Sequence, residues 1–427
     1  MKRDRMVPMI PVLLVLLLLI GATARITQTP AQATMPAQTD PLPEKAYLPL
    51  VVRSLTPQTV KIAAHFPLSG ALGREGTSLR NAAELAIEQQ AAALRERGFE
   101  VVLAAYDDSG SPVLAQRNAA EIIVDPSILC VNGHFNSDAA LAALPLYASV
   151  DLPMVSPANT NPQITDNFTN TFRLVGRDDI QGIVGLRFAR SVLRASSAYI
   201  VHDTTTYGQG IAEVFRREAE QQQVGIAGFV GTDETADFDR FFDDIRSTNP
   251  GVLYYAGRAA AAGTFFGQAR DPERGAVGSM PFLGPDGLDA PELVQFAGNF
   301  GVGIYYSTIA APINTYTTTQ QLAFVRDFEQ RYGAPPTSLA PKSYDATGLC
   351  LQAIARAAAQ TEGLPTRTQV LEAMRQLDPY QGVASVYQFN ANGDPELADY
   401  FVLITDDDAI WENNPLIFSG SFPPPTP

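Results

Sequence analysis

Short apolar runs alternate with longer amphipathic segments over most of this chain. The apolar runs of the first half cover residues 60–66, 100–106, 128–131, 153–155 and 172–175. After the first run, Leu79, Ala83 and Ile87 fall on one face of a helix that Thr77 or Ser78 is suited to cap. Ser111-Pro112 opens a second helix in the same way. This alternation is typical of a parallel sheet with helices on both faces.

The same pattern begins again with a helix at residues 182–194. The apolar runs that follow cover residues 198–201, 226–230, 252–255, 281–283 and 302–307. Two similar α/β halves in tandem are therefore expected. Three more helices are expected at 318–332, 344–359 and 367–377. Beyond them, residues 384–389 and 400–404 alternate like two strands paired around the turn dipeptide Asn392-Gly393.

The amino-terminal residues read as an export signal. Residues 1–5 are basic, residues 7–24 are apolar, and small residues suited to cleavage stand at 22–24 and 31–33. We expect a signal peptide over 1–33, with an uncleaved anchor helix as the alternative, and the rest of the chain outside the cytoplasm. Residues 34–58 have the proline-rich composition of a linker, within which 47–52 could form a short edge strand, and 421–427 form a proline-rich tail.

Composition narrows the function further. The chain has 427 residues, of which 46% are hydrophobic, so more than one packed lobe is expected. Its formal net charge of −15 disfavours nucleic acid and anionic lipid as partners. The two cysteines, Cys130 and Cys350, both lie in apolar runs. Outside the cytoplasm they can form a bridge, but we interpret them as two buried thiols.

Catalytic signatures are missing from the sequence. It contains no G-x-x-x-x-G-K, G-x-G-x-x-G, H-E-x-x-H or G-x-S-x-G motif. The three histidines, His65, His134 and His202, each stand at the carboxyl end of an expected strand. No pair has the spacing of metal ligands, so we interpret them as strand-end residues and expect neither a metal nor a cofactor. A hydrolase that uses His134 or His202 is the enzymatic alternative.

Small polar residues are concentrated in the loops after the expected strands, which is where α/β folds bind ligands. The loop 133–138 contains Phe135, Asn136 and Ser137, and Ser137 either binds a carboxylate at a helix amino terminus or caps that helix. Asn159 and Thr160 lie in the proline-flanked loop 156–162. In the second half, Tyr207 lies in the loop 203–210.

Asp286 lies in the loop 284–287. Its carboxylate either pairs with an ammonium group or caps the next helix.

Taken in order, these loops resemble those of the leucine/isoleucine/valine-binding family of extracytoplasmic solute-binding proteins. The matching elements run through most of the chain: Pro67-Leu68-Ser69-Gly70, Tyr106-Asp107-Asp108, Gly133-His134 with Ser137, Ser156-Pro157 with Thr160-Asn161-Pro162, Gln181-Gly182, His202-Asp203 with Tyr207-Gly208, Tyr254-Tyr255, Gly284-Pro285 and Tyr344-Asp345-Ala346. Each element is short, and their number, order and spacing make the resemblance specific.

The resemblance implies the periplasmic binding protein type I fold, in which two α/β lobes with parallel sheets are joined by three crossovers. By analogy, lobe 1 covers 59–177 and 309–383, and lobe 2 covers 178–308 and 384–420. A ligand would bind between the lobes. In relatives that bind amino acids, the residues matching Ser137, Asn159 and Thr160 hold the α-carboxylate and part of the ammonium. The acid matching Asp286 pairs with the ammonium, and the tyrosine matching Tyr207 closes from the other lobe.

Two positions depart from the family pattern. Where aliphatic-selective relatives carry tyrosines along the ligand side chain, this sequence has Glu75 and either Arg258 or Ala259. Asp286 is one methylene shorter than the usual glutamate. Because a buried charge is costly unless it is paired, Glu75 and Arg258 fit a polar or charged ligand side chain, or each other. The alternative is that both are solvated loop charges.

We therefore expect a non-enzymatic, exported, monomeric binding protein without cofactors, which delivers an amino acid to an ABC transporter permease. The proposed ligand residues are Ser137, Asn159, Thr160, Tyr207, Asp286, Glu75, Asn136, Phe135 and Arg258. One alternative keeps the fold but binds an amide, a urea-like compound or an aromatic acid. Another is a sensory ectodomain with an uncleaved amino-terminal helix.

Overall fold

The computed structural model describes residues 58–274, 277–406 and 411–425. The expected signal peptide, the strand expected at 47–52 and all but the last residue of the linker lie outside these described residues. Within them, no helix combines the length and the apolar character that a membrane span requires.

The first sheet has five parallel strands in the order β2-β1-β3-β4-β5. Its strands are β1 (Gln58–Phe66), β2 (Phe99–Asp107), β3 (Ile128–Gly133), β4 (Met154–Ser156) and β5 (Thr171–Arg173). The segments between them contain α1 (Gly73–Gln90), α2 (Ala92–Glu96), α3 (Pro112–Val124), α4 (Ser137–Ala148) and α5 (Gln163–Asp166). The strand positions confirm the prediction for the first half of the chain.

The second sheet has seven strands in the order β14-β13-β10-β9-β8-β6-β7. Five of them are parallel: β6 (Ser197–His202), β7 (Gly225–Gly231), β8 (Val252–Ala256), β9 (Phe282–Gly284) and β10 (Ile304–Thr308). The helices of this part are α6 (Asp178–Ser191), α7 (Thr206–Gln221), α8 (Asp239–Thr248), α9 (Ala259–Arg270) and α10 (Glu292–Ala297). The last two strands, β13 (Ala398–Ile404) and β14 (Leu416–Phe422), are antiparallel to their neighbours.

Helices cover both faces of the first sheet, as the near-continuous apolar runs predict. Successive residues of a strand point to opposite faces, so the two faces can be followed along β1. Ile62 packs with Leu349 and Ile354 on one face. Ala63 packs with Ile122 and Leu144 on the other.

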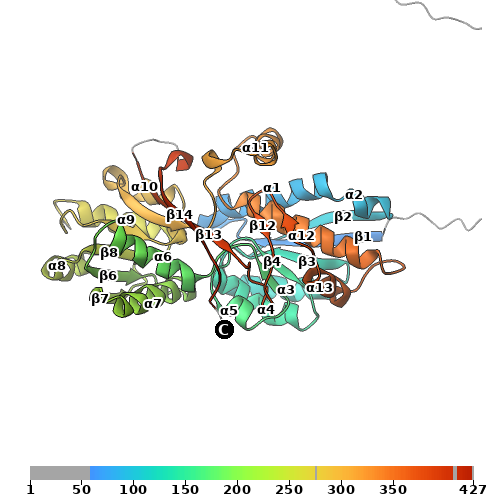
Figure 1. Cartoon of the computed structure of the whole chain (residues 1–427), viewed down its shortest axis with the longest axis horizontal. Coiled ribbons are helices and arrows are strands. Elements are labelled where there is room, and N and C mark those ends of the chain that lie inside the picture. Colours follow the sequence, from blue (N-terminus) through green and yellow to red (C-terminus); the bar gives the residue numbers. More distant parts are fainter. Residues whose placement is uncertain (1–57, 275–276, 407–410, 426–427) are drawn as a thin grey trace, which may run out of the picture. The chain divides into compact units, whose positions relative to one another are not determined.

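Helices also cover both faces of the second sheet, with Ile200 against Ile211 and Val201 against Phe242. Figure 1 shows this arrangement as the green strands β6 and β7 among helices α6 to α9.

The chain passes between the two sheets three times, which confirms the three-crossover topology. It leaves the first sheet after β5 and returns to it after β10 with α11 (Thr319–Tyr332), α12 (Ala340–Ala358) and α13 (Arg367–Arg375). Helix α12 packs against α1 and β3, and Figure 1 shows the orange α12 beside the blue α1. The chain then crosses again to add β13 and β14 to the second sheet.

The expected pairing of 384–389 with 400–404 is wrong. β12 (Val386–Tyr387) pairs with β11 (Tyr380–Gln381), whereas β13 pairs with β10 and β14. Tyr380 and Tyr387 are buried in the core of the first sheet, and Leu403 is buried in that of the second. The two segments therefore belong to different cores, which an alternating pattern alone does not distinguish.

Our interpretation of two buried thiols is also wrong, because Cys130 and Cys350 form a disulfide with a Cα–Cα distance of 5.8 Å. Cys130 is in the fully buried strand β3, and Cys350 is in α12, which packs directly on that strand. The bridge joins positions 220 residues apart in the sequence. Apolar runs around each cysteine predict burial but not which buried elements meet.

Helix α1 begins at Gly73, four residues before the predicted cap at Thr77. A Cβ at Gly76 would lie 2.1 Å from the carbonyl oxygen of Pro67, so only glycine fits where this first turn packs against the segment after β1. As a consequence, Glu75 lies in the first turn of a helix and not in a loop.

Candidate functional site

The loops after β3 and β4 are tied together by the side chain of Asn159. Its Oδ1 accepts hydrogen bonds from the His134 backbone N–H, at 3.1 Å, and from Ser156 Oγ, at 2.9 Å. Asn159 is fully buried, and its Nδ2 has no partner among the described residues. One end of the amide therefore holds the two loops together, while the other end keeps a free donor.

Helix α4 begins in the first of these loops, at Ser137. Asn136 occupies the N-cap position, but its side chain makes no capping hydrogen bond, and its Oδ1 lacks a partner in the described part of the chain. Ser137 is 3% exposed. The Phe135 side chain packs beside Phe66 and Leu79 in a small hydrophobic cluster. The helix amino terminus thus combines a buried hydroxyl with unpaired backbone donors.

Thr160 lies next to the first crossover, beside an acid that the sequence analysis missed. The Thr160 carbonyl accepts a hydrogen bond of 2.9 Å from the backbone N–H of Asp178, the first residue of α6. Asp178 is 1% exposed, and neither of its carboxylate oxygens has a well-formed hydrogen bond to any described residue. Burial and the nearby charge of Asp286 raise the pKa of Asp178 well above its usual value.

Ion pairs on both sides fix the backbone that carries Asp178. Arg177 pairs with Asp166 at 2.7 Å, with Asp179 at 2.8 Å and with Asp394 at 3.0 Å. The two neighbours of Asp178 in the sequence thus pair with each other. Asp178 itself forms no salt bridge with a described residue, although the charge of Arg173 acts on it. The run Arg177-Asp178-Asp179 directly after an expected strand was the signal that sequence reasoning overlooked.

Tyr207, Asp286 and Arg258 form one cluster at strand ends of the second sheet. The Tyr207 hydroxyl donates to Asp286 Oδ1 at 2.7 Å and accepts from the Gly287 N–H at 2.8 Å. The Arg258 guanidinium lies 5.2 Å from the centre of the Tyr207 ring. Burial raises the pKa of Asp286 to about 6, although Tyr207 and Arg258 act in the opposite direction. These three predicted residues therefore share one site.

Contacts across the first crossover connect most of the predicted residues. Asp178 neighbours Thr160 on one side and is electrostatically coupled to Asp286 on the other. Ser137 begins α4 and Tyr207 lies at the start of α7, and these two helices contact each other. Hydrogen bonds thus join Thr160 to Asp178 and Tyr207 to Asp286, the charge of Asp286 acts on Asp178, and Ser137 begins a helix that contacts the Tyr207 helix.

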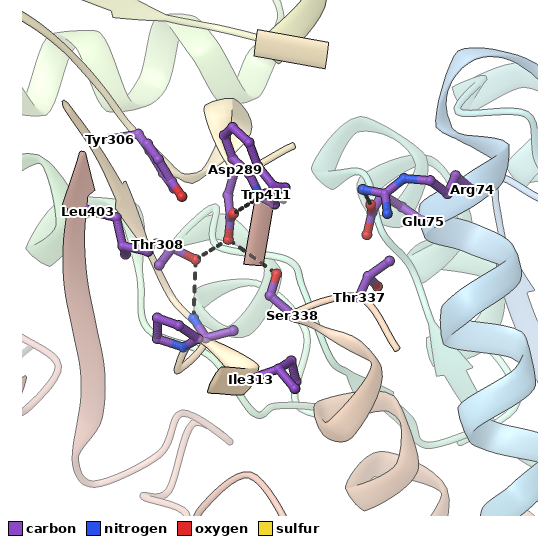
Figure 2. Close-up of a pocket in the computed structure, with 12 residues that line it drawn as sticks. Arg74, Glu75, Asp289, Tyr306, Thr308, Ile313, Thr337, Ser338, Leu403 and Trp411 are labelled. Atoms are coloured by element: carbon purple, nitrogen blue, oxygen red, sulfur yellow. Dashed lines mark hydrogen bonds and ion pairs between the residues drawn. The ribbon is translucent and has the colours of Figure 1, made fainter. Parts of the chain in front are cut away.

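Glu75 is not part of this group of residues; it lines a small cavity of about 30 Å³. Figure 2 shows its lining: Arg74, Glu75, Asp289, Tyr306, Thr308, Ala310, Pro312, Ile313, Thr337, Ser338, Leu403 and Trp411. Glu75 pairs with Arg74 at 2.6 Å and not with Arg258. Burial raises the pKa of Glu75 to about 7 in spite of this pairing. None of Ser137, Thr160, Tyr207 or Asp286 lines the cavity.

Asp289 is a second acid that sequence reasoning did not single out. It accepts hydrogen bonds from Thr308 Oγ1 at 2.6 Å, Trp411 Nε1 at 3.1 Å and Ser338 Oγ at 3.2 Å. Figure 2 shows these side chains converging on its carboxylate. Burial nevertheless raises the pKa of Asp289. Asp289 is only three residues from Asp286, so the loop after β9 supplies acids both to the Tyr207 cluster and to the cavity.

The described contacts do not form a catalytic triad. His134 Nδ1 lies 3.0 Å from Asp108 Oδ2, and His202 Nδ1 accepts a hydrogen bond of 3.2 Å from the Thr204 N–H. Neither histidine has a described hydrogen bond to a serine hydroxyl, which a nucleophilic serine would require.

Comparison with known proteins agrees with this fold. The sequence pattern of the periplasmic binding protein family matches residues 59–408. The Leu/Ile/Val-binding protein homolog 1 of Brucella abortus is 27% identical, over 80% of this chain and 89% of its own length.

Two solved structures are similar. The leucine binding protein LivK of Thermotoga maritima has a TM-score of 0.75 and 25% identity, covering 84% of this chain and 98% of that one. A solute binding protein of R. palustris in complex with benzoate has a TM-score of 0.69 and 18% identity, covering 86% and 97%. The resemblance seen in the sequence is confirmed: this chain belongs to the periplasmic binding protein family, whose members bind ligands and are not enzymes.

Proposed function

We propose that this chain is the extracytoplasmic solute-binding protein of an ABC transporter and that it captures an α-amino acid. One observation carries the choice of ligand: the buried carboxylate of Asp178, which lacks a well-formed partner in the described structure and lies beside Thr160 and Asp286. A buried carboxylate is costly unless a cation or several donors compensate it. The α-ammonium group of an amino acid supplies both a positive charge and three N–H donors.

The roles of the remaining residues follow from this placement. Ser137 and the amino terminus of α4 would hold the α-carboxylate, because unpaired backbone donors there favour an anion. Asn159, with its free Nδ2, and Asn136 would contact the same group. Asp286, Tyr207 and Thr160 would join Asp178 around the ammonium. Phe135 would act by supporting the loop, since it packs beside Phe66.

The ligand side chain is proposed to be polar or cationic. Asp286 is electrostatically coupled to Asp289, which lines the cavity with Glu75 and Arg74. Two acids and one arginine next to the ammonium site favour a hydrogen-bonding or basic side chain over an aliphatic one. Arg258, stacked on Tyr207, would then close the site and not pair with Glu75. The names of the relatives support an amino acid ligand but not this finer choice.

An aromatic acid is the alternative ligand, as in the R. palustris protein bound to benzoate. Benzoate has a carboxylate but no ammonium, so it would leave Asp178 and Asp286 buried without a counter-charge. The acidic character of the site therefore favours the amino acid.

The proposal extends to the partners and the location of the protein. A solute-binding protein of this kind would deliver its ligand to a membrane permease, and the expected signal peptide would export it as a monomer. The division into lobe 1 (59–177 and 309–383) and lobe 2 (178–308 and 384–420) remains part of this proposal.

Calorimetric titration of the mature protein with a panel of amino acids tests the proposal, with Asp178→Asn as the decisive variant. Loss of a charged partner for the ammonium should weaken binding by roughly 30-fold or more, on the order of 2 kcal/mol. Asp179→Asn is the matched control, because it makes the same change at the next residue, which pairs with Arg177. Equal affinity of both variants, or tighter binding of des-amino acids than of amino acids, would contradict the proposal.

A further inference from the structure

Three buried polar side chains meet at the carboxyl ends of neighbouring strands of the first sheet. His65 is the penultimate residue of β1, Asp108 follows β2, and His134 follows β3. These strands are adjacent in the order β2-β1-β3, with His65 in register with Gly133. All three side chains are 0% exposed. The sheet therefore brings together two histidines that are far apart in the sequence, which spacing rules do not detect.

The distances between their ligand atoms suit a small divalent metal. His134 Nδ1 is 3.0 Å and His65 Nε2 is 4.0 Å from Asp108 Oδ2, and all three ligand atoms lie within 4.8 Å of one another. Tetrahedral zinc with bonds of about 2.0–2.1 Å holds its ligand atoms about 3.3 Å apart. Shifts of less than about 1 Å would therefore complete the coordination.

Neighbouring groups already orient the histidine and the carboxylate as metal ligands. His65 Nδ1 lies 2.8 Å from the Tyr147 hydroxyl, and Asp108 Oδ1 accepts a hydrogen bond of 2.9 Å from the Gly110 N–H. The Asn118 amide donates to the Asp107 carbonyl at 2.8 Å, and its Nδ2 lies 3.3 Å from His65 Nε2. With Asn118 as donor, Nε2 is the acceptor nitrogen of His65, and a metal bound there would replace this hydrogen bond.

Protein groups alone do not satisfy this cluster. His134 Nε2 is buried and has no partner in the described residues. The described basic side chains form no salt bridge with Asp108 other than those with His65 and His134. A cation at the centre would compensate the carboxylate and bind His65 Nε2 and His134 Nδ1, whereas His134 Nε2 stays outside the coordination.

We propose that His65, Asp108 and His134 bind one zinc ion that fastens the ligand-proximal loop 133–137 to the ends of β1 and β2. Two imidazoles and one carboxylate are a donor set that zinc accepts. The site lies inside the first sheet's layer and takes no part in amino acid recognition. The proposed zinc site can therefore be tested independently of the proposed ligand.

Elemental mass spectrometry of the mature protein, expressed in zinc-supplemented medium and purified without chelator, tests the site. We expect about one zinc per chain in the wild type and less than a tenth of that in His65→Gln and His134→Gln. His202→Gln is the matched control, because His202 also ends a strand but lies in the second sheet, and it should keep the wild-type content. Zinc-free wild type, or equal zinc in all variants, would overturn the proposal.

Cobalt provides a measurement that does not depend on how well the variants fold. Wild-type protein refolded from urea with Co²⁺ should show the visible absorption of a tetrahedral nitrogen and oxygen site, and zinc should abolish it. Refolding with zinc should also raise the melting temperature above that of protein refolded with EDTA. Absence of the cobalt spectrum together with unchanged melting would exclude a metal at this cluster. Amino acid titration of the same samples keeps this result separate from the proposed transport function.

Discussion

At the scale of single residues, the site is notable for acids that are buried without full compensation. Asp178 has no well-formed partner within the described structure, and Glu75 and Asp286 keep raised pKa values of about 7 and about 6 although neighbouring groups act in the opposite direction. A protein that needs only stability would replace such groups. Under the proposed function, a ligand that carries positive charge compensates their burial when it binds.

Glu75 gives a stability prediction with a definite sign. Its pKa is raised from 4.5 to about 7 in the folded protein. Between these pH values Glu75 is therefore mainly protonated in the folded state and mainly ionised in the unfolded chain. Ionisation therefore destabilises the ligand-free fold as pH rises through this window, by on the order of 3 kcal/mol at most. Glu75→Gln should gain stability relative to wild type as pH rises from 4.5 to about 7.

Urea unfolding of both proteins at a series of pH values measures this difference. Glu88→Gln is a suitable control, since Glu88 lies on the same helix and is exposed. A difference between wild type and Glu75→Gln that stays constant over the whole window would show that Glu75 ionises as freely in the folded protein as in the unfolded chain.

At the scale of elements, the disulfide fastens the returning helix α12 to β3. Both cysteines belong to the same core cluster as Val60 and Leu349, so the bridge reinforces a contact that apolar packing already makes. Replacing both cysteines with alanine should lower the free energy of unfolding by about 2–5 kcal/mol, because the unfolded chain loses a long covalent loop. The measurement is urea unfolding with and without reductant.

In that experiment the wild type should shift toward the variant when it is reduced, while the variant should not respond to reductant. Equal urea midpoints for the oxidised wild type and the variant would contradict the expected contribution of the bridge.

The elements also show what a sequence can predict. The strands and helices were placed well where the hydrophobic residues recur with a clear period. An example is α11, which begins within one residue of the predicted start and ends, as predicted, at Tyr332. The failures concern contacts between distant elements: the cysteine pair, the partner of β12 and the start of α1 all depend on which surfaces meet. Gly76 illustrates this, because its close approach to Pro67 is not visible in local propensity.

In the candidate site, too, the predictions failed where they depended on which distant residues meet. Tyr207 and Asp286 were predicted from their loops, and the structure joins them by a hydrogen bond. Asp178 was missed because it lies between Arg177 and Asp179 and reads as part of a solvated charge run. Only folding reveals that its two neighbours pair with each other. Likewise, the grouping of His65 with His134 follows from strand order and not from sequence spacing.

At the scale of the whole molecule, the proposed ligand would touch residues carried by both sheets. Ser137 and Thr160 follow strands of the first sheet, whereas Tyr207 and Asp286 follow strands of the second. A ligand shifts a conformational equilibrium only by its differential affinity for the two states. An amino acid that bridges these residues should therefore favour a closed state in which both sets are near it.

Small-angle X-ray scattering of the mature protein, with and without a saturating amino acid, measures this closure. The radius of gyration should decrease on binding in the wild type. Asp286→Ala should lose most of the decrease, because the ligand then contacts mainly the first sheet's residues and gains little from closing. Glu273→Ala is the control on an exposed acid of the second-sheet half and should behave as the wild type does. If calorimetry proves saturation while the radius stays unchanged, the ligand binds without bringing the two sets of residues together.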